Sequence, residues 1–570
     1  MHRQRFLVLL ALLAAWPGTA AAGGLELLPG GTRSVGRGGA VAARPMDPMV
    51  LLHNPAGLTE LSGEQVMLHI DTPIHSMCVD PYGFYGWGVY EAGTSEFGDQ
   101  LEVDDPDDPT IGATYATTPL PEVCNSAPVV PIPHMAWATR LGDFALGIGF
   151  VAPTVVAGLQ YGGDDGTIDV DGEAFPTPTR YQMIKQQVEF ALAPSFGFAY
   201  RLMPELSVGL NIQIAMLRAK TWAIQNTVAG TQPSNDMLAE LEAEDFFLPA
   251  ITASVYVQPT DAIDLMAAFR WVDQFDGPGK VSFETNTFHQ NADEGPIPFE
   301  NDPIKLDRIQ VGLPYALTLG ARYSGQLPRF EDDKPGPGDP MDTELWDVEL
   351  DATYNFNEQA KANKVDVGEA VTVITREVGG GGDSASVPLA DLSQVSIERH
   401  ALDSVAVRLG GSYAVMPRQL ALSAGLFYES RGVEPGYINV DSFALARVGA
   451  GIGAMWRIGS VDLTAAVGQI FQEELDLAPP PHENLEDLDE DDPQSGFDQR
   501  VGGTFSGGVR QGGVVLEDPD APDPSDADAV AALQARAGIA TAARPNRIVN
   551  AGLYTANFTI ISLGIVYRYD

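Results

Sequence analysis

The residues that could support catalysis are few and lie far apart along this chain of 570 residues. His134 and Ser195 each stand alone, and the chain has no G-x-S-x-G or H-E-x-x-H motif. The glycine runs at 379–382 and 507–508 lack the strand and helix that flank a phosphate-binding loop. The sequence therefore predicts no enzyme, cofactor or metal centre. The enzymatic alternative is a membrane-embedded lipase, which would need a Ser–His pair with an acidic or amide partner.

Cysteines and carboxylates offer two other kinds of chemistry. Cys78 and Cys124 bracket one acidic, irregular loop, which predicts a loop-closing disulfide in an exported protein, with free thiols as the alternative. The formal net charge of −44 excludes nucleic acid, whose phosphates need cationic partners. Acid without any base fills residues 91–108, 483–498 and 517–528. These tracts could bind divalent cations through oxygen ligands, or they could simply keep long loops solvated.

The first 22 residues are predicted to be a signal peptide. Arg3 and Arg5 form the charged region, Phe6–Trp16 the apolar region, and Ala20–Ala22 the small-residue cleavage site. The alternative, a transmembrane anchor, is disfavoured because the apolar run is shorter than the roughly 20 residues that a spanning helix needs. We place the mature start near Gly23.

The elements that would position any site are strands with a period of two. In Leu206–Met216, apolar residues alternate with small or polar ones, and the same pattern recurs at 309–324, 405–415, 420–428, 448–458 and 561–569. These runs are longer than the five or six residues typical of soluble strands. Because lipid leaves no partner for a free sheet edge, we predict an all-β transmembrane antiparallel β-barrel.

The alternation places about 14 strands in this barrel, an even number as in bacterial single-chain barrels. Tight periplasmic turns are predicted at 141–143, 203–205, 259–261, 416–418 and 459–460, whereas 326–342 is too long for such a turn. Long outer loops are predicted at 78–131, 154–185, 225–245, 274–307, 358–398 and 476–549. The predicted strands begin near Gln65, Ile132, Asp143, Gln187, Glu205, Phe246, Ala262, Arg308, Thr343, Arg399, Gln419, Ser442, Ser460 and Ala551.

A stretch rich in Gly, Ala and Pro, Gly36–Leu58, precedes the first strand. It contains Gly36-x-Gly38-Gly39-Ala40-x-Ala42 and then the turn sequence Asn54-Pro55-Ala56-Gly57. This pattern resembles the N-terminal signature of the outer-membrane long-chain fatty-acid and hydrocarbon transporters, the FadL/TodX family. The resemblance implies a bacterial outer-membrane location, a hatch at 23–62 and a barrel at 63–570 around it. The long acidic loops, including 76–131 and 476–549, depart from the family pattern.

The resemblance also implies a route for a hydrophobic ligand. Capture would use the third and fourth outer loops, where Met237, Leu238 and Leu241 precede Phe246 and Phe247. Their helical spacing equally suits packing of the loop on the barrel rim.

Release would use a kink in the third strand, 143–153. Gly147, Gly149 and Pro153 lower the energetic cost of such a kink. Alternatively, the two glycines are small lumen-facing residues that leave room for the hatch. With release through the kinked strand, the ligand would enter the outer-membrane lipid.

A fatty-acid carboxylate would need a cation in the lumen. By alternation Arg270, Arg322, Arg408 and Arg447 point inward, and Arg33, Arg37 and Arg44 lie on the hatch segment. Asp347, Glu349 and Asp351 also point inward, so ion pairs across the lumen are the alternative, and a neutral hydrocarbon rivals a fatty acid as ligand.

Three functions remain open from the sequence. The first is a passive transporter of long-chain fatty acids or other hydrophobic compounds. The second is a structural or adhesion barrel whose acidic loops bind cations or partners, and the third is a general porin. The alternating Ile565, Tyr567 and Tyr569 near the end of the chain resemble the signal read by the barrel-assembly machinery, although Asp570 follows them.

Overall fold

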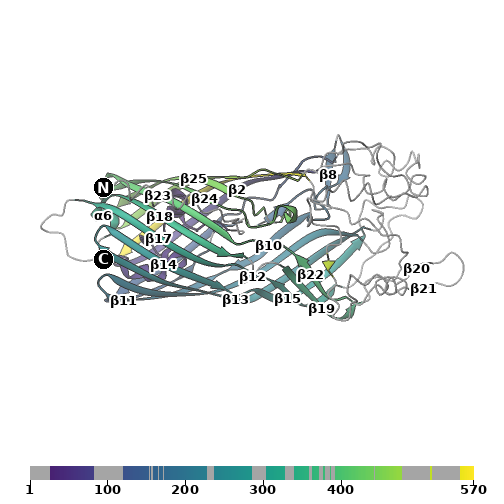
Figure 1. The fold of residues 1–570 in the computed structure, drawn as a ribbon, viewed down its shortest axis with the longest axis horizontal. Coiled ribbons are helices and arrows are strands. Elements are labelled where there is room, and N and C mark those ends of the chain that lie inside the picture. Colours follow the sequence, from purple (N-terminus) through teal and green to yellow (C-terminus); the bar gives the residue numbers. More distant parts are fainter. Residues whose placement is uncertain are drawn as a thin grey trace, which may run out of the picture.

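The computed structural model describes residues 26–81, 120–152, 154–155, 158–164, 166–170, 172–226, 236–285, 303–327, 339–357, 362–371, 377–378, 385–386, 392–441, 443–477, 514–515 and 552–569. These residues form a closed antiparallel barrel with a wall of 14 strands (Figure 1). Pairing of the first wall strand with the last, from Glu64 opposite Tyr569 to Pro81 opposite Gly552, closes the wall.

The wall strands follow one another in chain order, each paired with the next. They are β2 (Glu64–Pro81), β4 (Ile132–Leu141), β5 (Phe144–Phe150), β11 (Pro194–Met203), β12 (Leu206–Asn226), β13 (Asp236–Thr260), β14 (Ile263–Val272), β17 (Tyr315–Gln326), β18 (Glu344–Phe356), β23 (Ser404–Met416), β24 (Leu420–Glu429), β25 (Arg447–Ile458), β26 (Val461–Gln472) and β29 (Gly552–Tyr569). The predicted all-β barrel and its strand order are thus confirmed. Four predicted starts are several residues early, because β11, β17, β23 and β25 begin at Pro194, Tyr315, Ser404 and Arg447 and not at Gln187, Arg308, Arg399 and Ser442. The predicted start at Phe246 is late, because β13 begins at Asp236.

Several predicted outer loops are instead strands that lengthen the wall. β12 and β13 pair as far as Asn226 opposite Asp236, which leaves only 227–235 of the predicted 225–245 loop between them. The predicted loops at 154–185, 274–307 and 358–398 likewise contain strand pairs. The strands that extend the wall are β7 (Gly158–Gln160), β10 (Lys185–Leu192), β15 (Phe275–Thr285), β16 (Ile304–Val311), β19 (Ala362–Val371) and β22 (Leu392–Glu398). Two separate two-stranded sheets are formed by β8 (Thr167–Val170) with β9 (Glu173–Pro176) and by β20 (Glu377–Val378) with β21 (Ala385–Ser386). Period-two apolar alternation does not reveal these strands, because charged side chains lie beside a small apolar cluster around Phe275 and no continuous apolar face results.

The outward face of the wall is apolar and the inward face is buried. On β29, Ile561, Leu563, Ile565 and Tyr567 are exposed, whereas Ile560, Ser562 and Val566 between them are buried. The same alternation runs along β2, β11, β18 and β25. An apolar outer face on a closed sheet is the form in which strands cross a bilayer. No helix of the described residues is long and apolar enough to cross a membrane.

The segment before the wall crosses the lumen. It consists of β1 (Glu26–Leu28), α2 (Thr32–Gly36), α3 (Val50–His53) and the 3-10 helix η1 (Pro55–Glu60). Helix α2 contacts β24, β25, β26 and β29, while η1 contacts β5, β11, β12 and β13 on another arc of the wall. We call residues 26–62 the inner segment.

Several predictions fall outside the described residues. They are the signal peptide at 1–22, the acidic tracts at 91–108, 483–498 and 517–528, and Pro153. Of the predicted loop 476–549, the structure describes only residues 476–477 and the short strand β28 (Val514–Val515).

Candidate functional site

The glycine motif of the inner segment is explained by its close approach to the wall. Gly38 and Gly39 have φ angles of 60° and 84°, a region that side chains with a Cβ disfavour. A Cβ on Gly38 would lie 2.8 Å from the backbone of Gly425, and one on Gly36 would lie 2.9 Å from Gly453. The motif therefore marks where two backbones touch.

The Asn54 turn joins two parts of the inner segment. The buried side-chain amide of Asn54 donates to the Ala42 carbonyl at 3.0 Å, and the backbone carbonyl of Asn54 accepts from the Gly57 amide at 2.9 Å. Ala56 in turn packs so closely on the wall that a Cβ on Gly209 would lie 2.1 Å from its nitrogen. Wall glycines at inward positions are the sequence signal that corresponds to this packing.

Carboxylates of β18 hold the inner segment by charge. Arg37 pairs with Asp347 at 2.7 Å and with Glu349 at 2.8 Å, and its guanidinium is buried. Glu349 also accepts from the Ala43 amide at 2.6 Å, and Asp351 accepts from the amides of Val41 and Ala42. The acidic face of this strand thus binds the inner segment at successive positions.

The other arginines predicted to bind a ligand carboxylate are largely engaged with protein groups. Arg322 pairs with Asp264 at 2.8 Å and with Glu344, and Arg447 pairs with Glu429 at 2.7 Å. Arg44 donates to Tyr256 at 2.9 Å, and Arg408 donates to the Thr353 hydroxyl at 2.8 Å. Arg270 is half-buried on β14 and also has a partner. Ion pairing within the lumen, the alternative considered from sequence, accounts for Arg37, Arg322 and Arg447.

The third wall strand leaves the barrel after Phe150. Up to that residue β5 pairs on both sides, with Met135 of β4 and Pro194 of β11. The next strand, β6 (Thr154–Val155), pairs instead with β1 of the inner segment, with Thr154 opposite Leu28 and Val155 opposite Glu26. The chain then rejoins the wall where Gly158 of β7 pairs with Gln187 of β10. The wall is therefore interrupted, and the displaced strand is bonded to the inner segment.

The two predicted kink glycines lie in the paired part of β5, before this interruption, whereas Pro153 lies outside the described residues. Gly147 sits in a regular ladder opposite Ala138 and Gly197, and a Cβ there would lie 2.8 Å from the Leu51 side chain. Gly149 pairs regularly with Ala136 and Ser195. For Gly147, the structure agrees with the alternative of a small residue that leaves room for the inner segment.

The interruption extends to the second wall strand. β4 pairs with β2 only as far as Ile132 opposite Asp71, and pairing resumes with β3 (Val123–Cys124), where Cys124 lies opposite Cys78. Residues 125–131 between them carry no strand pairing, and Val129 and Val130 are exposed. We call this interruption of strand pairing, which lies between 72–76 of β2, 125–131, 151–152, 154–155 and 188–193, the wall gap.

The wall gap begins at lipid depth. At its lower edge Asp71 pairs with Ser562 of β29, whose neighbours Ile561 and Leu563 form part of the exposed apolar face. The outward residue Ile74 of β2, beside the gap, is also exposed. At Ser76 and Asn557 the outward face becomes polar.

A buried polar cluster fixes the inner segment at the inner side of the gap. The Gly31 amide donates to Asp71 at 2.8 Å, His134 Nε2 lies 3.1 Å from the same oxygen, and Ser562 donates to the other oxygen. Ser195 instead accepts from Gln213 at 2.9 Å, so the two residues that could serve a lipase, His134 and Ser195, have different partners. The cluster links the inner segment, β2, β4 and β29.

The residues predicted to capture a ligand lie on β13 rather than in a loop. Met237 pairs with Gln225 across the hairpin, and Leu238 and Leu241 are half-buried. Leu241 packs with Phe275, Leu306 and Ile309 of the outer hairpins. Phe246 and Phe247 are exposed, and Phe247 continues the outward face of Ile251 and Val255. Residues 237–248 therefore form a strand and not a helix, and Leu241, Phe246 and Phe247 do not share one lumen surface.

The lumen beyond the inner segment is filled with apolar side chains. Residues 430–441 and 443–446, between β24 and β25, fold inward and bury Ile438, Val440 and Leu445. They share one cluster with Leu27 and Leu28 of the inner segment, and Tyr161 donates to the Val440 carbonyl at 3.2 Å. This apolar cluster reaches from β1 toward the outer rim.

At the other end of the barrel, the described part of the turn before β18 packs on the wall and the inner segment. Its short helix α6 (Pro340–Thr343) buries Met341 against Ala421 and Met455, beside Met46 of the inner segment. Asp339 caps this helix through the Met341 amide at 2.8 Å and pairs with Arg457 at 3.0 Å and with Arg568. Burial alone would raise the pKa of Asp339, but Arg568 and Arg457 hold that pKa below its usual value.

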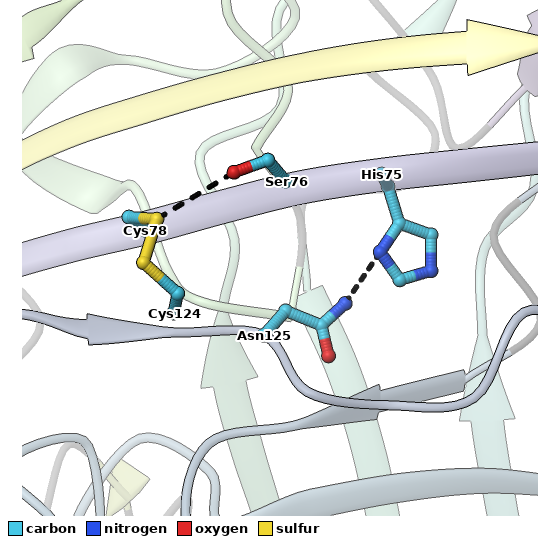
Figure 2. Close-up of a disulfide and its surroundings, with 5 residues drawn as sticks. All are labelled: His75, Ser76, Cys78, Cys124 and Asn125. Carbon is cyan, nitrogen blue, oxygen red and sulfur yellow. Dashed lines mark hydrogen bonds between the residues drawn. A yellow bond between two sulfur atoms is a disulfide. The ribbon is translucent and has the colours of Figure 1, made fainter.

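The two cysteines form a disulfide at the outer margin of the gap. Cys78 of β2 and Cys124 of β3 are bonded to each other (Figure 2). The next residue, Asn125, lies with its side-chain nitrogen 2.8 Å from His75 Nδ1.

No protein-family model and no curated protein matches the sequence. Among solved structures, a Pseudomonas aeruginosa FadL homologue is 14% identical, with 97% of this chain and 100% of that chain covered and a TM-score of 0.60. The Ralstonia pickettii toluene transporter TbuX is 13% identical, with 95% and 98% covered and a TM-score of 0.52. The Pseudomonas putida toluene transporter TodX is 12% identical, with 96% and 98% covered and a TM-score of 0.51. The chain therefore shares the fold of these barrels.

Proposed function

We propose that this barrel, which has the fold of the FadL-type barrels and the toluene transporters, is a passive bacterial outer-membrane transporter of long-chain fatty acids or other hydrophobic compounds. The observation that carries the proposal is the wall gap at lipid depth, with its displaced strand paired to the inner segment. A ligand that leaves through this gap reaches hydrocarbon without crossing water.

The interior supports a hydrophobic ligand over a water-filled pore. Porin channels have polar interiors, whereas here an apolar cluster lies between the outer rim and the inner segment. On the other side, α6 packs on the wall and the inner segment. In our proposal the ligand enters the apolar cluster, displaces its side chains and leaves sideways.

Movement of the inner segment would gate the exit. Because β1 is bonded to β6, and Gly31 to Asp71, a shift of this segment must also shift the strand at the gap. This is the hatch role proposed for residues 26–62. Outer-membrane lipid would receive the ligand.

The substrate head group need not be charged. Arg322 and Arg447 are already ion-paired, so neither offers an uncompensated cation for a carboxylate. This favours neutral hydrocarbons within the proposed class. A structural or adhesion role of the acidic loops depends on tracts outside the described residues and stays a prediction.

Pinning the inner segment to the displaced strand tests the proposal. Leu28 and Thr154 are register partners, so the pair Leu28→Cys/Thr154→Cys should form a cross-link. We expect vesicles with the cross-linked barrel to lose uptake of radiolabelled oleate and hexadecane, and to regain it after reduction. The matched control, Ala424→Cys/Ile452→Cys, joins two lipid-facing wall positions and should keep uptake. Full uptake by the pinned barrel would contradict gating, and no uptake of either compound by the unmodified protein would contradict transport.

A further inference from the structure

We propose that the Cys78–Cys124 bridge and Asn125 form the upper frame of the wall gap and set the width of molecule that can leave through it. The inference rests on the proposed lateral release. It assigns a specificity role to three residues at the outer margin, where the second and third wall strands meet again after the interruption.

Asn125 ties both sides of the gap together. On one side its backbone amide donates to the Met77 carbonyl at 2.7 Å, and its side chain contacts His75 of β2 (Figure 2). On the other side its carbonyl oxygen Oδ1 accepts from the Gln160 amide of β7 at 2.8 Å. The Ser126 amide adds a bond to the Gln160 carbonyl at 2.8 Å. These bonds reconnect β2 to β7 above the gap.

The disulfide holds this connection at a fixed height. Cys124 is adjacent to Asn125 in sequence, and its sulfur is bonded to Cys78, which lies opposite it in the ladder. Below the bridge, residues 126–131 run beside β2 without strand pairing. The bridge therefore prevents the second strand from sliding along β2 and enlarging the gap.

The height of the frame matches the end of the apolar belt. Ile74, just below it, is exposed on the outward face, whereas Ser76 at its level is polar. The frame thus confines the opening to hydrocarbon depth. A straight chain passes below it, but a wide rigid molecule must displace it.

The test compares a straight and a wide probe. We would measure uptake of hexadecane and of pyrene by vesicles that contain wild-type protein, Cys78→Ser/Cys124→Ser, or Asn125→Ala. We expect the pyrene-to-hexadecane ratio to rise at least about fivefold in both variants, because loss of a single ordinary hydrogen bond already changes an equilibrium by about that factor. Asn125→Ala removes three side-chain bonds, and Cys78→Ser/Cys124→Ser removes the bridge. The control Asn355→Ala removes a comparable bond to Ser404 between wall strands away from the gap and should leave the ratio unchanged.

Two measurements separate this inference from folding defects and from the proposed function. Reducing folded wild-type protein in the vesicles should raise the ratio in the same way, without any need for a variant to fold. Hydrogen exchange should speed up at the Gln160 and Ser126 amides in the double variant. An unchanged ratio with hexadecane uptake retained, or unchanged exchange at these amides, would overturn the role of the frame alone. Failure of wild-type protein to take up hexadecane would instead overturn the transport proposal.

Discussion

Single residues decide how closely the inner segment approaches the wall. Arg37 fills a buried position between Asp347 and Glu349, and removing one partner of such a pair leaves an uncompensated charge in a poorly solvated place. Gly38 instead contributes by having no side chain at all. At two adjacent residues, an ion pair and the absence of a Cβ therefore both hold the inner segment close to the wall.

Replacing Gly38 with alanine should loosen the inner segment. The new Cβ faces a positive φ and also lies 2.8 Å from wall backbone, whereas Gly142→Ala has a similar φ of 69° with nothing within 4 Å. Both variants incur the conformational strain, but only Gly38→Ala adds overpacking, which costs about 1–3 kcal/mol. Hydrogen exchange at the amides of residues 40–43 should speed up in Gly38→Ala and not in Gly142→Ala. Equal exchange in both would contradict the close contact.

At the scale of elements, apolar alternation predicts the wall strands that have one face toward lipid and the other toward the lumen. The tight turns and the order of the wall strands follow from that pattern. The outer hairpins do not, because charged contacts such as Lys220 with Glu240 at 3.0 Å lie beside only a small apolar cluster around Phe275. The bond from Arg37 to Asp347 joins residues 310 positions apart, and no local pattern identifies such a pair. The family resemblance, and not alternation, directed attention to the third strand, and the pairing of β6 with the distant strand β1 has no local signal.

The turn before β18 gives a prediction that depends on pH. The pKa of Asp339 is depressed in the folded protein, so its ionised form stabilises the fold. This stabilisation is fully present above the ordinary carboxyl pKa of about 4 and is lost as pH falls through the lower folded value. We expect Asp339→Asn to lower the thermal unfolding midpoint at neutral pH, and the difference from wild type to shrink below pH of about 4. A difference that does not change with pH would assign the effect to capping of α6 alone.

For the whole molecule, Asp71 connects the inner segment to the wall. It accepts hydrogen bonds from Gly31 and Ser562 and contacts His134, so three separate elements converge on one carboxylate. The wall gap, the inner segment and the seam between β2 and β29 are thus mechanically linked.

Removing this carboxylate should favour the open state. Asp71→Ala leaves buried donors without an acceptor, at about 1–3 kcal/mol each, and the inner segment loses its bond at Gly31. We expect hexadecane uptake to rise several-fold, measured as the initial rate in vesicles. Asp276→Ala, which breaks an exposed pair with Arg308 on an outer hairpin, serves as the control and should leave the rate unchanged. A fall in uptake with Asp71→Ala in a folded barrel would indicate that the cluster assists passage rather than restraining it.

The seam between β2 and β29 has a consequence for the order of assembly. The two strands, each of 18 residues, come from opposite ends of the described chain, and the bond from Ser562 to Asp71 spans 491 positions. The ring cannot be completed until β29 has been delivered. The inner segment immediately precedes β2 and contacts strands on both arcs of the ring. We expect the growing sheet to form around it, so that the inner segment limits how far the sheet curls before β29 closes the ring.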